Sequence, residues 1–247
     1  IHEVRTGFEG TRSAIAISDG ITIDFEPPSA GEVNDGASGD IWLSNSIDTS
    51  YANWSGFSDA LSGITIYEYA LGSSVGSNDI IDWTIVGSDT TFVENSGLSL
   101  EHAAYYYFSV RATDLVGNVS SVITTNGVTA DLVGPIKGTV MDGLTADAEW
   151  INTDTIRASW AGFTDPLSGI KKYQYGIGKS SGASDVVDWT DNSLDTTITL
   201  KLTLEEAVTY YVSVRGVDKV DNTGEAATSD GITADFTPPS IVSASIE

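Results

Sequence analysis

Tyr106-Tyr-Phe-Ser-Val-Arg-Ala-Thr-Asp-Leu-Val-Gly-Asn118 decides the fold, because the chain repeats it as Tyr210-Tyr-Val-Ser-Val-Arg-Gly-Val-Asp-Lys-Val-Asp-Asn222. In both copies apolar or small residues alternate with polar ones, which is the period of a β-strand with one buried face. Each copy then ends in Asp-x-x-x-Asn, which predicts a tight turn between two strands. The sequence therefore indicates tandem modules rich in β-strands.

The repeat extends beyond this strand. Trp54-Ser-Gly-Phe-Ser-Asp59 corresponds to Trp160-Ala-Gly-Phe-Thr-Asp165, and a Ser-Gly pair followed by two tyrosines recurs downstream of each. Each unit contains about seven short alternating runs separated by Gly, Asp, Asn and Ser, with no sustained helical period. This pattern predicts an all-β chain of two tandem antiparallel β-sandwich domains in an elongated arrangement.

Proline-containing segments divide the chain at three places: Phe25-Glu-Pro-Pro28, Leu132-Val-Gly-Pro135 and Phe236-Thr-Pro-Pro239. Proline fixes φ and removes a backbone donor, so these segments are expected to be stiff extended linkers. We expect residues 25–134 to form module 1 and residues 135–240 to form module 2. Residues 1–24 are expected to be the C-terminal strands of a preceding incomplete repeat, and residues 241–247 the start of a following module.

The composition is strongly acidic, with 35 Asp and Glu residues against 11 Lys and Arg residues and a formal net charge of −24. Such a surface repels nucleic acid and anionic membranes, and it favours the binding of cations. The chain has no cysteine, so neither a disulfide nor a thiolate metal site is available. No apolar run approaches the ~20 residues that span a bilayer. We therefore expect no nucleic-acid partner and no membrane insertion of this segment.

The side chains that carry enzyme chemistry do not form a recognisable pattern. His2 and His102 are the only histidines, and neither recurs in the other unit. The sequence contains no phosphate-binding loop and no His-Glu-x-x-His pair. Carboxylates abound, but small sandwich modules lack the deep cleft that a glycosidase pair requires. We expect the chain not to be an enzyme.

The two units resemble fibronectin type III modules, which are immunoglobulin-like sandwiches, of the divergent kind strung together in bacterial surface and secreted proteins. The residues that carry the resemblance are a second-strand Trp, a third-strand Tyr and a Leu-x5-Tyr-x-Φ-x-Val-Arg run in each unit: Trp54, Trp160, Tyr67, Tyr173, Leu100 to Arg111 and Leu204 to Arg215. The resemblance implies that Trp and the first Tyr pack the core. It also implies that Tyr106 and Tyr210 form a corner that ties a loop to the strand.

By this resemblance the chain is expected to be a set of non-catalytic modules of a large extracellular bacterial protein, secreted or at the cell surface, acting as a spacer and adhesion array. Its expected partners are neighbouring repeats of the same chain and a cell-surface or polysaccharide ligand. One alternative is an accessory carbohydrate-binding module of a polysaccharide-degrading enzyme, with Trp83 and Trp189 as a stacking platform. Another is a subunit of an extracellular filament assembled by strand addition through the two ends of the chain.

Aspartates recur at three matching places: before the proline linker, after the Trp strand and at the end of the Tyr strand. In a sandwich of this likeness these places meet at one end of each module. We therefore expect two groups, named here the module 1 triad (Asp24, Asp59 and Asp114) and the module 2 triad (Asp131, Asp165 and Asp218). Carboxylate oxygens are preferred calcium ligands, and Asn118 or Asn222 could add a carbonyl oxygen. Calcium at the joints is the expected cofactor, although turn-forming aspartates explain the same spacing without a metal.

Overall fold

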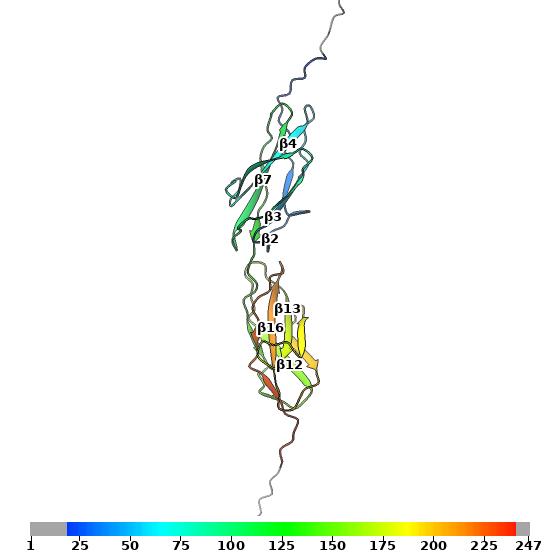
Figure 1. Cartoon of the computed structure of the whole chain (residues 1–247), viewed down its shortest axis with the longest axis vertical. Helices are drawn as coiled ribbons and strands as arrows, with labels where there is room; N and C mark the ends of the chain where they lie inside the picture. Colours follow the sequence, from blue (N-terminus) through cyan, green and yellow to red (C-terminus); the bar gives the residue numbers. More distant parts are fainter. Residues whose placement is uncertain (1–18, 241–247) are drawn as a thin grey trace, which may run out of the picture.

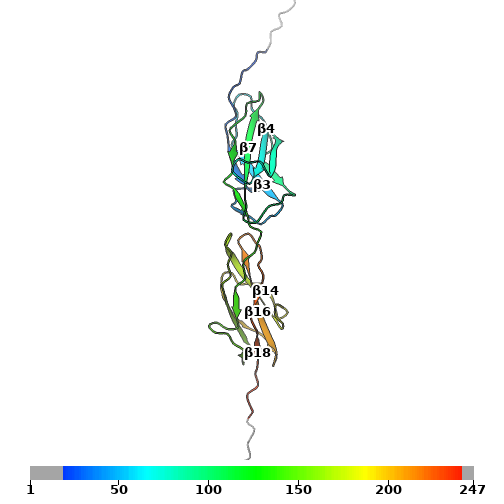
Figure 2. The ribbon, with the colours of Figure 1, turned by 90° about the vertical axis from the view of Figure 1, so that its left-hand side faces the viewer.

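The structure, a computed structural model, describes residues 19–240 and shows two β-sandwiches arranged end to end (Figure 1). A view turned by 90° shows the same linear arrangement (Figure 2). The strands of one sandwich lie within residues 32–130 and those of the other within residues 139–234. Among the described residues no helix is long and apolar enough to cross a membrane. The prediction of an all-β fold with two tandem sandwiches is confirmed.

Module 1 consists of a smaller and a larger sheet. Its strands are β1 (Glu32–Asp35), β2 (Leu43–Ser44), β3 (Ser50–Ser55), β4 (Ile64–Gly72), β5 (Ile81–Gly87), β6 (Phe92–Asn95), β7 (Tyr105–Asp114), β8 (Ile123–Thr124) and β9 (Val128–Ala130). The smaller sheet has the order β1-β3-β6, and the larger has the order β2-β9-β7-β4-β5 with β8 also paired to β7. All these pairs are antiparallel except the short pair between β2 and β9.

Module 2 repeats this topology strand for strand. Its strands are β10 (Thr139–Met141), β11 (Trp150–Ile151), β12 (Thr155–Ala161), β13 (Ile170–Gly178), β14 (Val187–Asp191), β15 (Thr197–Lys201), β16 (Thr209–Asp218), β17 (Ala227–Thr228) and β18 (Ile232–Ala234). The sheets have the orders β10-β12-β15 and β11-β18-β16-β13-β14, with β17 paired to β16. Every pairing among the named strands stays within one module. The strands predicted for the ends of the chain lie outside the described residues, apart from residues 19–24, which form no strand.

The central strand of each larger sheet is the one that the repeated stretch predicted. In β7 the side chains of Tyr106, Phe108, Val110 and Ala112 are at most 3% exposed, because alternate residues face the smaller sheet. On one side β7 pairs with β4 over eight registered positions, and on the other it pairs with β8 and β9. The apolar face of this strand therefore forms the centre of the core.

Each module has its own core, and the predicted tryptophans lie in it. Trp54 and Trp160 are 2% and 3% exposed. The ring of Trp54 meets Tyr67 edge-on at 5.7 Å, and the ring of Trp160 meets Tyr173 edge-on at 5.9 Å. Such aromatic pairs add stabilisation beyond the buried area. The core role that the resemblance implied for these four residues is confirmed.

The predicted tyrosine corners are also present. The hydroxyl oxygen of Tyr106 accepts the backbone N–H of Glu101 at 2.8 Å, and that of Tyr210 accepts the N–H of Glu205 at 2.8 Å. Both tyrosines are almost completely buried, so the loop that crosses between the sheets is held against the central strand. The corner prediction is confirmed in both modules.

One buried carboxylate works against stability. Asp35, at the end of β1, is fully buried, and its Oδ2 accepts the N–H of Gly127 at 3.0 Å. Its Oδ1 has no hydrogen-bond partner among the described residues. Burial raises the pKa of Asp35 from its ordinary value of 3.8 to about 6, because water no longer solvates the charge. The folded state therefore favours the protonated form.

We expect Tyr210→Phe to lower the free energy of unfolding of module 2 by about 1 kcal/mol, because it leaves the Glu205 N–H without its acceptor. Urea unfolding followed by fluorescence measures the change. Tyr211→Phe is the matched control, because Tyr211 is the next residue of β16, is only half-buried and is not the acceptor of the Glu205 N–H. Equal losses in the two variants would contradict the corner's role.

We expect Asp35→Asn to stabilise module 1 at pH 8 by about 2 kcal/mol and to have almost no effect below pH ~4. The raised pKa means that Asp35 favours folding only while protonated, so wild type loses this contribution as the pH rises through about 6. Urea titrations at both pH values in chelator give the difference, with Asp89→Asn as an exposed control. If Asp35→Asn stabilised module 1 equally at both pH values, the buried charge of Asp35 would not be the cause.

Candidate metal centres

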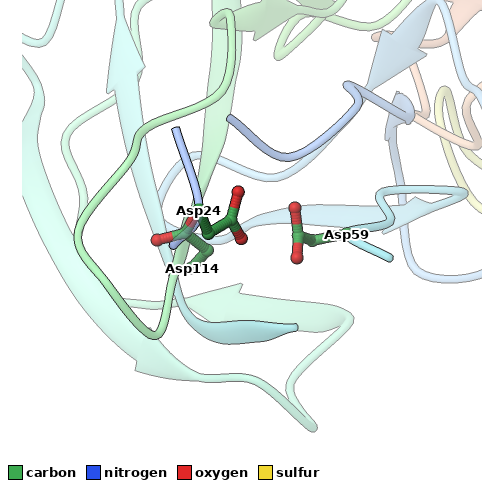
Figure 3. A group of neighbouring side chains, drawn as sticks. All are labelled: Asp24, Asp59 and Asp114. Carbon is green, nitrogen blue, oxygen red and sulfur yellow. The ribbon is translucent and has the colours of Figure 1, made fainter. Parts of the chain in front are cut away.

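The module 1 triad is assembled from three separate segments. Asp24 lies on the linker before the module, Asp59 lies in the loop between β3 and β4, and Asp114 ends β7. Each contributes a carboxylate oxygen, and these three oxygens all lie within 4.8 Å of one another. Figure 3 shows the three side chains converging on one space. The structure thus brings together the three aspartates that the sequence pattern grouped.

The module 2 triad repeats this arrangement. Asp131 directly follows β9 on the linker between the modules, Asp165 lies in the loop between β12 and β13, and Asp218 ends β16. Carboxylate oxygens of these three residues also lie within 4.8 Å of one another. A cluster that recurs at matching positions in both modules reflects their shared topology. Each module therefore carries one triad where its incoming linker meets two of its own loops.

The loop aspartates are held in place by their own backbone. Oδ1 of Asp165 accepts the N–H groups of the three residues Leu167, Ser168 and Gly169 at 2.7 to 3.1 Å. Asp59 does the same in its loop. Burial raises the pKa of Asp165, but the hydrogen bonds outweigh it and leave the pKa below its usual value. One oxygen thus forms the turn and the charge is retained, which leaves the second oxygen for another partner.

The aspartates that end the long strands cap the hairpin turns. Oδ1 of Asp114 accepts the N–H groups of residues 116–118, and Oδ2 accepts the side-chain NH2 of Asn118 at 2.8 Å. Burial raises the pKa of Asp114, and these hydrogen bonds more than reverse the shift. Asp218 is held similarly, with its Oδ2 accepting from Asn222 at 2.8 Å. The tight turns predicted from Asp-x-x-x-Asn are confirmed.

The asparagines do not serve as the carbonyl ligands that we expected. Asn222 turns its NH2 group toward Asp218, and the same group donates to the backbone carbonyl of Asp131 at 2.8 Å. In module 1 the NH2 group of Asn118 has longer contacts of 3.4 Å with the linker carbonyls. The amides therefore act as donors that tie the linker to the hairpin, and a ligating amide oxygen stays a prediction.

The linker aspartates carry a carboxylate oxygen without a hydrogen bond. Asp131 is fully buried and Asp24 is 8% exposed. Oδ2 of each has no hydrogen-bond partner among residues 19–240. An ionised carboxylate that loses water without gaining a partner is costly, so such groups in proteins are usually paired or bound to a metal. The two orphan oxygens are thus the features of the triads that turn formation does not explain.

No basic side chain between residues 19 and 240 neutralises the triads. Within the described part of the chain, neither Lys nor Arg forms an ion pair with any member of the two triads. Nδ1 of His102 lies 3.6 Å from Asp131, but this nitrogen accepts the N–H of Leu132 at 3.1 Å. A nitrogen that accepts a hydrogen bond carries no proton, so His102 does not supply a charged donor to Asp131.

The triads have suitable dimensions and chemistry for one calcium ion each. Calcium takes six to eight oxygen ligands at roughly 2.3–2.6 Å, so oxygens on opposite sides of one ion are about 4.6–5.2 Å apart. All three carboxylate oxygens of each triad fall within such a sphere. Three carboxylates leave coordination positions for backbone carbonyls and water.

The aromatic residues of the carbohydrate-binding alternative lie elsewhere, on the larger sheets. Trp83 and Trp189 are half-buried, on β5 and β14. The guanidinium of Arg111 lies 4.4 Å from the ring centre of Trp83, and that of Arg215 lies 4.1 Å from that of Trp189. One face of each ring is therefore covered by an arginine, as expected for a cation–π contact. The sequence pattern gave no sign of this pairing.

A third acidic group was not found from the sequence. Asp142, Asp147 and Asp230 contribute carboxylate oxygens that also lie within 4.8 Å of one another. By the alignment of the two units, Asp142 matches Asp35, but Asp230 matches Asn126. A search for aspartates that recur in both units therefore passes over this group.

Comparison with known proteins gives a likeness of fold. No protein-family profile matches the sequence. No curated protein matches it either. Among solved structures, fibronectin(III)-like modules of Clostridium thermocellum CbhA are 13% identical, with a TM-score of 0.41, over 83% of this chain and 94% of theirs. The FN1-FN3 domains of chicken CNTN1 are 14% identical, with a TM-score of 0.39, over 84% of this chain and 68% of theirs. The β-sandwich assignment itself rests on the strand topology described above.

Proposed function

We propose that this chain is a non-catalytic array of modules in a large extracellular bacterial protein, acting as a spacer and adhesion array whose joints are stiffened by calcium. The observation that carries the proposal is the pair of matching triads, each with a buried, unpaired carboxylate oxygen on the linker. An ion bound there would connect the linker to two loops of the following module.

The contacts around the linker support a role in fixing the joint. The backbone of Ile136 exchanges two hydrogen bonds with Thr164, at 2.8 and 3.2 Å. Asn45 of module 1 donates from its side chain to the carbonyl of Val220 in the hairpin turn of module 2, at 2.6 Å. Gly134 lies so close to residues 223–224 that a Cβ atom would meet their backbone at 2.5 Å. These contacts therefore hold the linker against module 2. A cation would in addition neutralise the negative charge of the module 2 triad.

The charge of the chain supports the same proposal. A formal net charge of −24 makes the surface self-repelling, and carboxylates gathered within a few ångströms concentrate that repulsion at the joints. Calcium would remove it where two modules meet. Calcium sites in extracellular modules commonly have dissociation constants of about 10⁻⁴–10⁻³ M, so the ion would be bound outside the cell.

We expect calcium to raise the melting temperature, and Asp165→Asn to reduce that response in module 2 alone. If only the folded state binds, calcium at 100 times its dissociation constant adds about 2.7 kcal/mol per site, and a tenfold weaker site adds about 1.4 kcal/mol. Asparagine keeps the turn-forming oxygen but loses the charge. Calorimetry with calcium and with chelator measures both modules.

Asp185→Asn is the matched control for this measurement, because Asp185 also caps a loop, by accepting the N–H of Lys179, but lies outside the triads. Its response to calcium should equal that of wild type. A melting temperature that does not change on chelation would exclude calcium stabilisation of the joints.

We expect small-angle scattering of the 247-residue chain to show an extended rod in calcium and a more flexible ensemble in chelator. The physical reason is that the ion links the linker to the loops that set the angle between modules. At a calcium concentration near the wild-type dissociation constant, Asp165→Asn should scatter more like the chelated protein than wild type does. A compact particle in calcium would contradict the spacer function, and identical curves in the two conditions would contradict the stiffening.

A further inference from the structure

We propose a further divalent cation site in module 2, formed by Asp142, Asp147 and Asp230 at the end opposite the module 2 triad. β10 starts near the joint and runs away from it, and Asp142 directly follows its last residue. Asp230 lies in the turn before β18, which pairs with the beginning of β16, whereas Asp218 of the triad ends that strand. The two acidic groups thus lie at opposite ends of the same sandwich.

The site combines two segments that are distant in sequence. Asp142 and Asp147 belong to the segment that crosses from β10 in the smaller sheet to β11 in the larger sheet. Asp230 comes from the turn between β17 and β18. One carboxylate oxygen of each lies within 4.8 Å of the others, which suits a single ion with oxygen ligands.

An orphan atom in the cluster points to a ligand. Asp142 is fully buried, and its Oδ2 accepts the N–H of Gly231 at 2.9 Å. Its Oδ1 has no hydrogen-bond partner among the described residues. Burial first, and then the negative charges of Asp147 and Asp230, together raise the pKa of Asp142 to about 6. A buried carboxylate that faces two others, with one oxygen left without a hydrogen bond, is the arrangement that a bound cation relieves.

The residues around the cluster neither neutralise its charge nor block access to it. Within residues 19–240 no Lys or Arg forms an ion pair with the three aspartates, and nearby Lys137 pairs with Glu225 at 3.0 Å. The backbone N–H of Asp142 donates to Oδ1 of Asp147 at 2.8 Å, which brings the two ends of the 142–147 segment together. Asp147 and Asp230 also line an open surface hollow, so an ion and its remaining waters have access.

Module 1 provides an internal comparison. Asp35 has the same burial and the same unpaired Oδ1 as Asp142. There, however, the third position is Asn126, and its NH2 group donates to Oδ2 of Asp40 at 2.8 Å. An amide donor replaces a carboxylate, so the group has one negative charge fewer and one carboxylate ligand fewer. We therefore assign the additional site to module 2 only.

The ligand set favours a hard ion with flexible geometry. Three carboxylates without nitrogen or sulfur ligands suit calcium, whereas magnesium demands near-ideal octahedral geometry and retains its waters. A bound ion would clamp the crossover segment to the β17–β18 turn, and so close the end of the sandwich.

Isothermal titration of the chelator-treated chain with calcium chloride tests the proposal. We expect Asp230→Asn to bind one calcium ion fewer per chain than wild type. Because Asn occupies the matching position in module 1, the substitution is compatible with the fold. Circular dichroism serves to check that the variant is folded. The reciprocal variant Asn126→Asp should bind one ion more.

The variant Asp165→Asn distinguishes calcium binding at the module 2 triad from calcium binding at this further site. If both proposals hold, Asp230→Asn removes one site and Asp165→Asn weakens a different one, and the double variant shows both changes. If the joints bind no calcium, Asp230→Asn alone still removes one ion. Wild-type stoichiometry and affinity in Asp230→Asn would overturn the further site, whatever the joints bind.

Discussion

The structure depends on the pairing of one long strand in each module with the strands on both of its sides. β7 and β16 are in the middle of the larger sheets, and their inward residues are buried almost completely. Their length matters as much as their burial, because ten residues reach from one end of the sandwich to the other. The tyrosine corner fixes one end of the strand, and the aspartate-capped turn fixes the other.

This strand connects the core to the candidate metal centres. The same alternation that buries Val212 and Val214 carries the chain to Asp218, whose position is therefore set by the packing of the whole sheet. The linker aspartate has a different origin, since Asp131 directly follows β9 of the preceding module. The joint between the two modules thus combines a residue placed by one core with residues placed by the next. Rigid elements hold ligands more accurately than loops alone.

Much of the fold and of the candidate metal centres could be predicted because the sequence repeats within the chain. Trp54, Tyr106 and the aspartates at the joints recur in both units, and the resemblance to fibronectin type III modules implied their roles and positions. The donor role of Asn222 was not predictable, because residue type does not reveal which side of an amide faces a neighbour. The covering of Trp83 by Arg111 depends on the register between β5 and β7 through β4, which composition does not give.

The acidic group around Asp142 shows the limit of an argument from repetition. Its buried member recurs as Asp35, but Asp230 corresponds to Asn126, so the two modules diverge at the position that determines the charge. Only the fold shows that the crossover segment and the last hairpin meet there. Differences between repeats can therefore carry as much chemical information as their shared residues.

The position of Asp131 has a mechanical consequence. A pulling force along the array passes from β9 into module 2 through residues 131–138, because no other backbone connects the modules. Asp131 is the first residue of this load-bearing segment, and Asn222 holds its carbonyl to the hairpin. Tension on the array would therefore act first on the carboxylate that faces Asp165 and Asp218, before it reaches the hydrogen bonds of β10. If the module 2 triad binds calcium as we propose, resistance to stretching would vary with the calcium concentration around the protein.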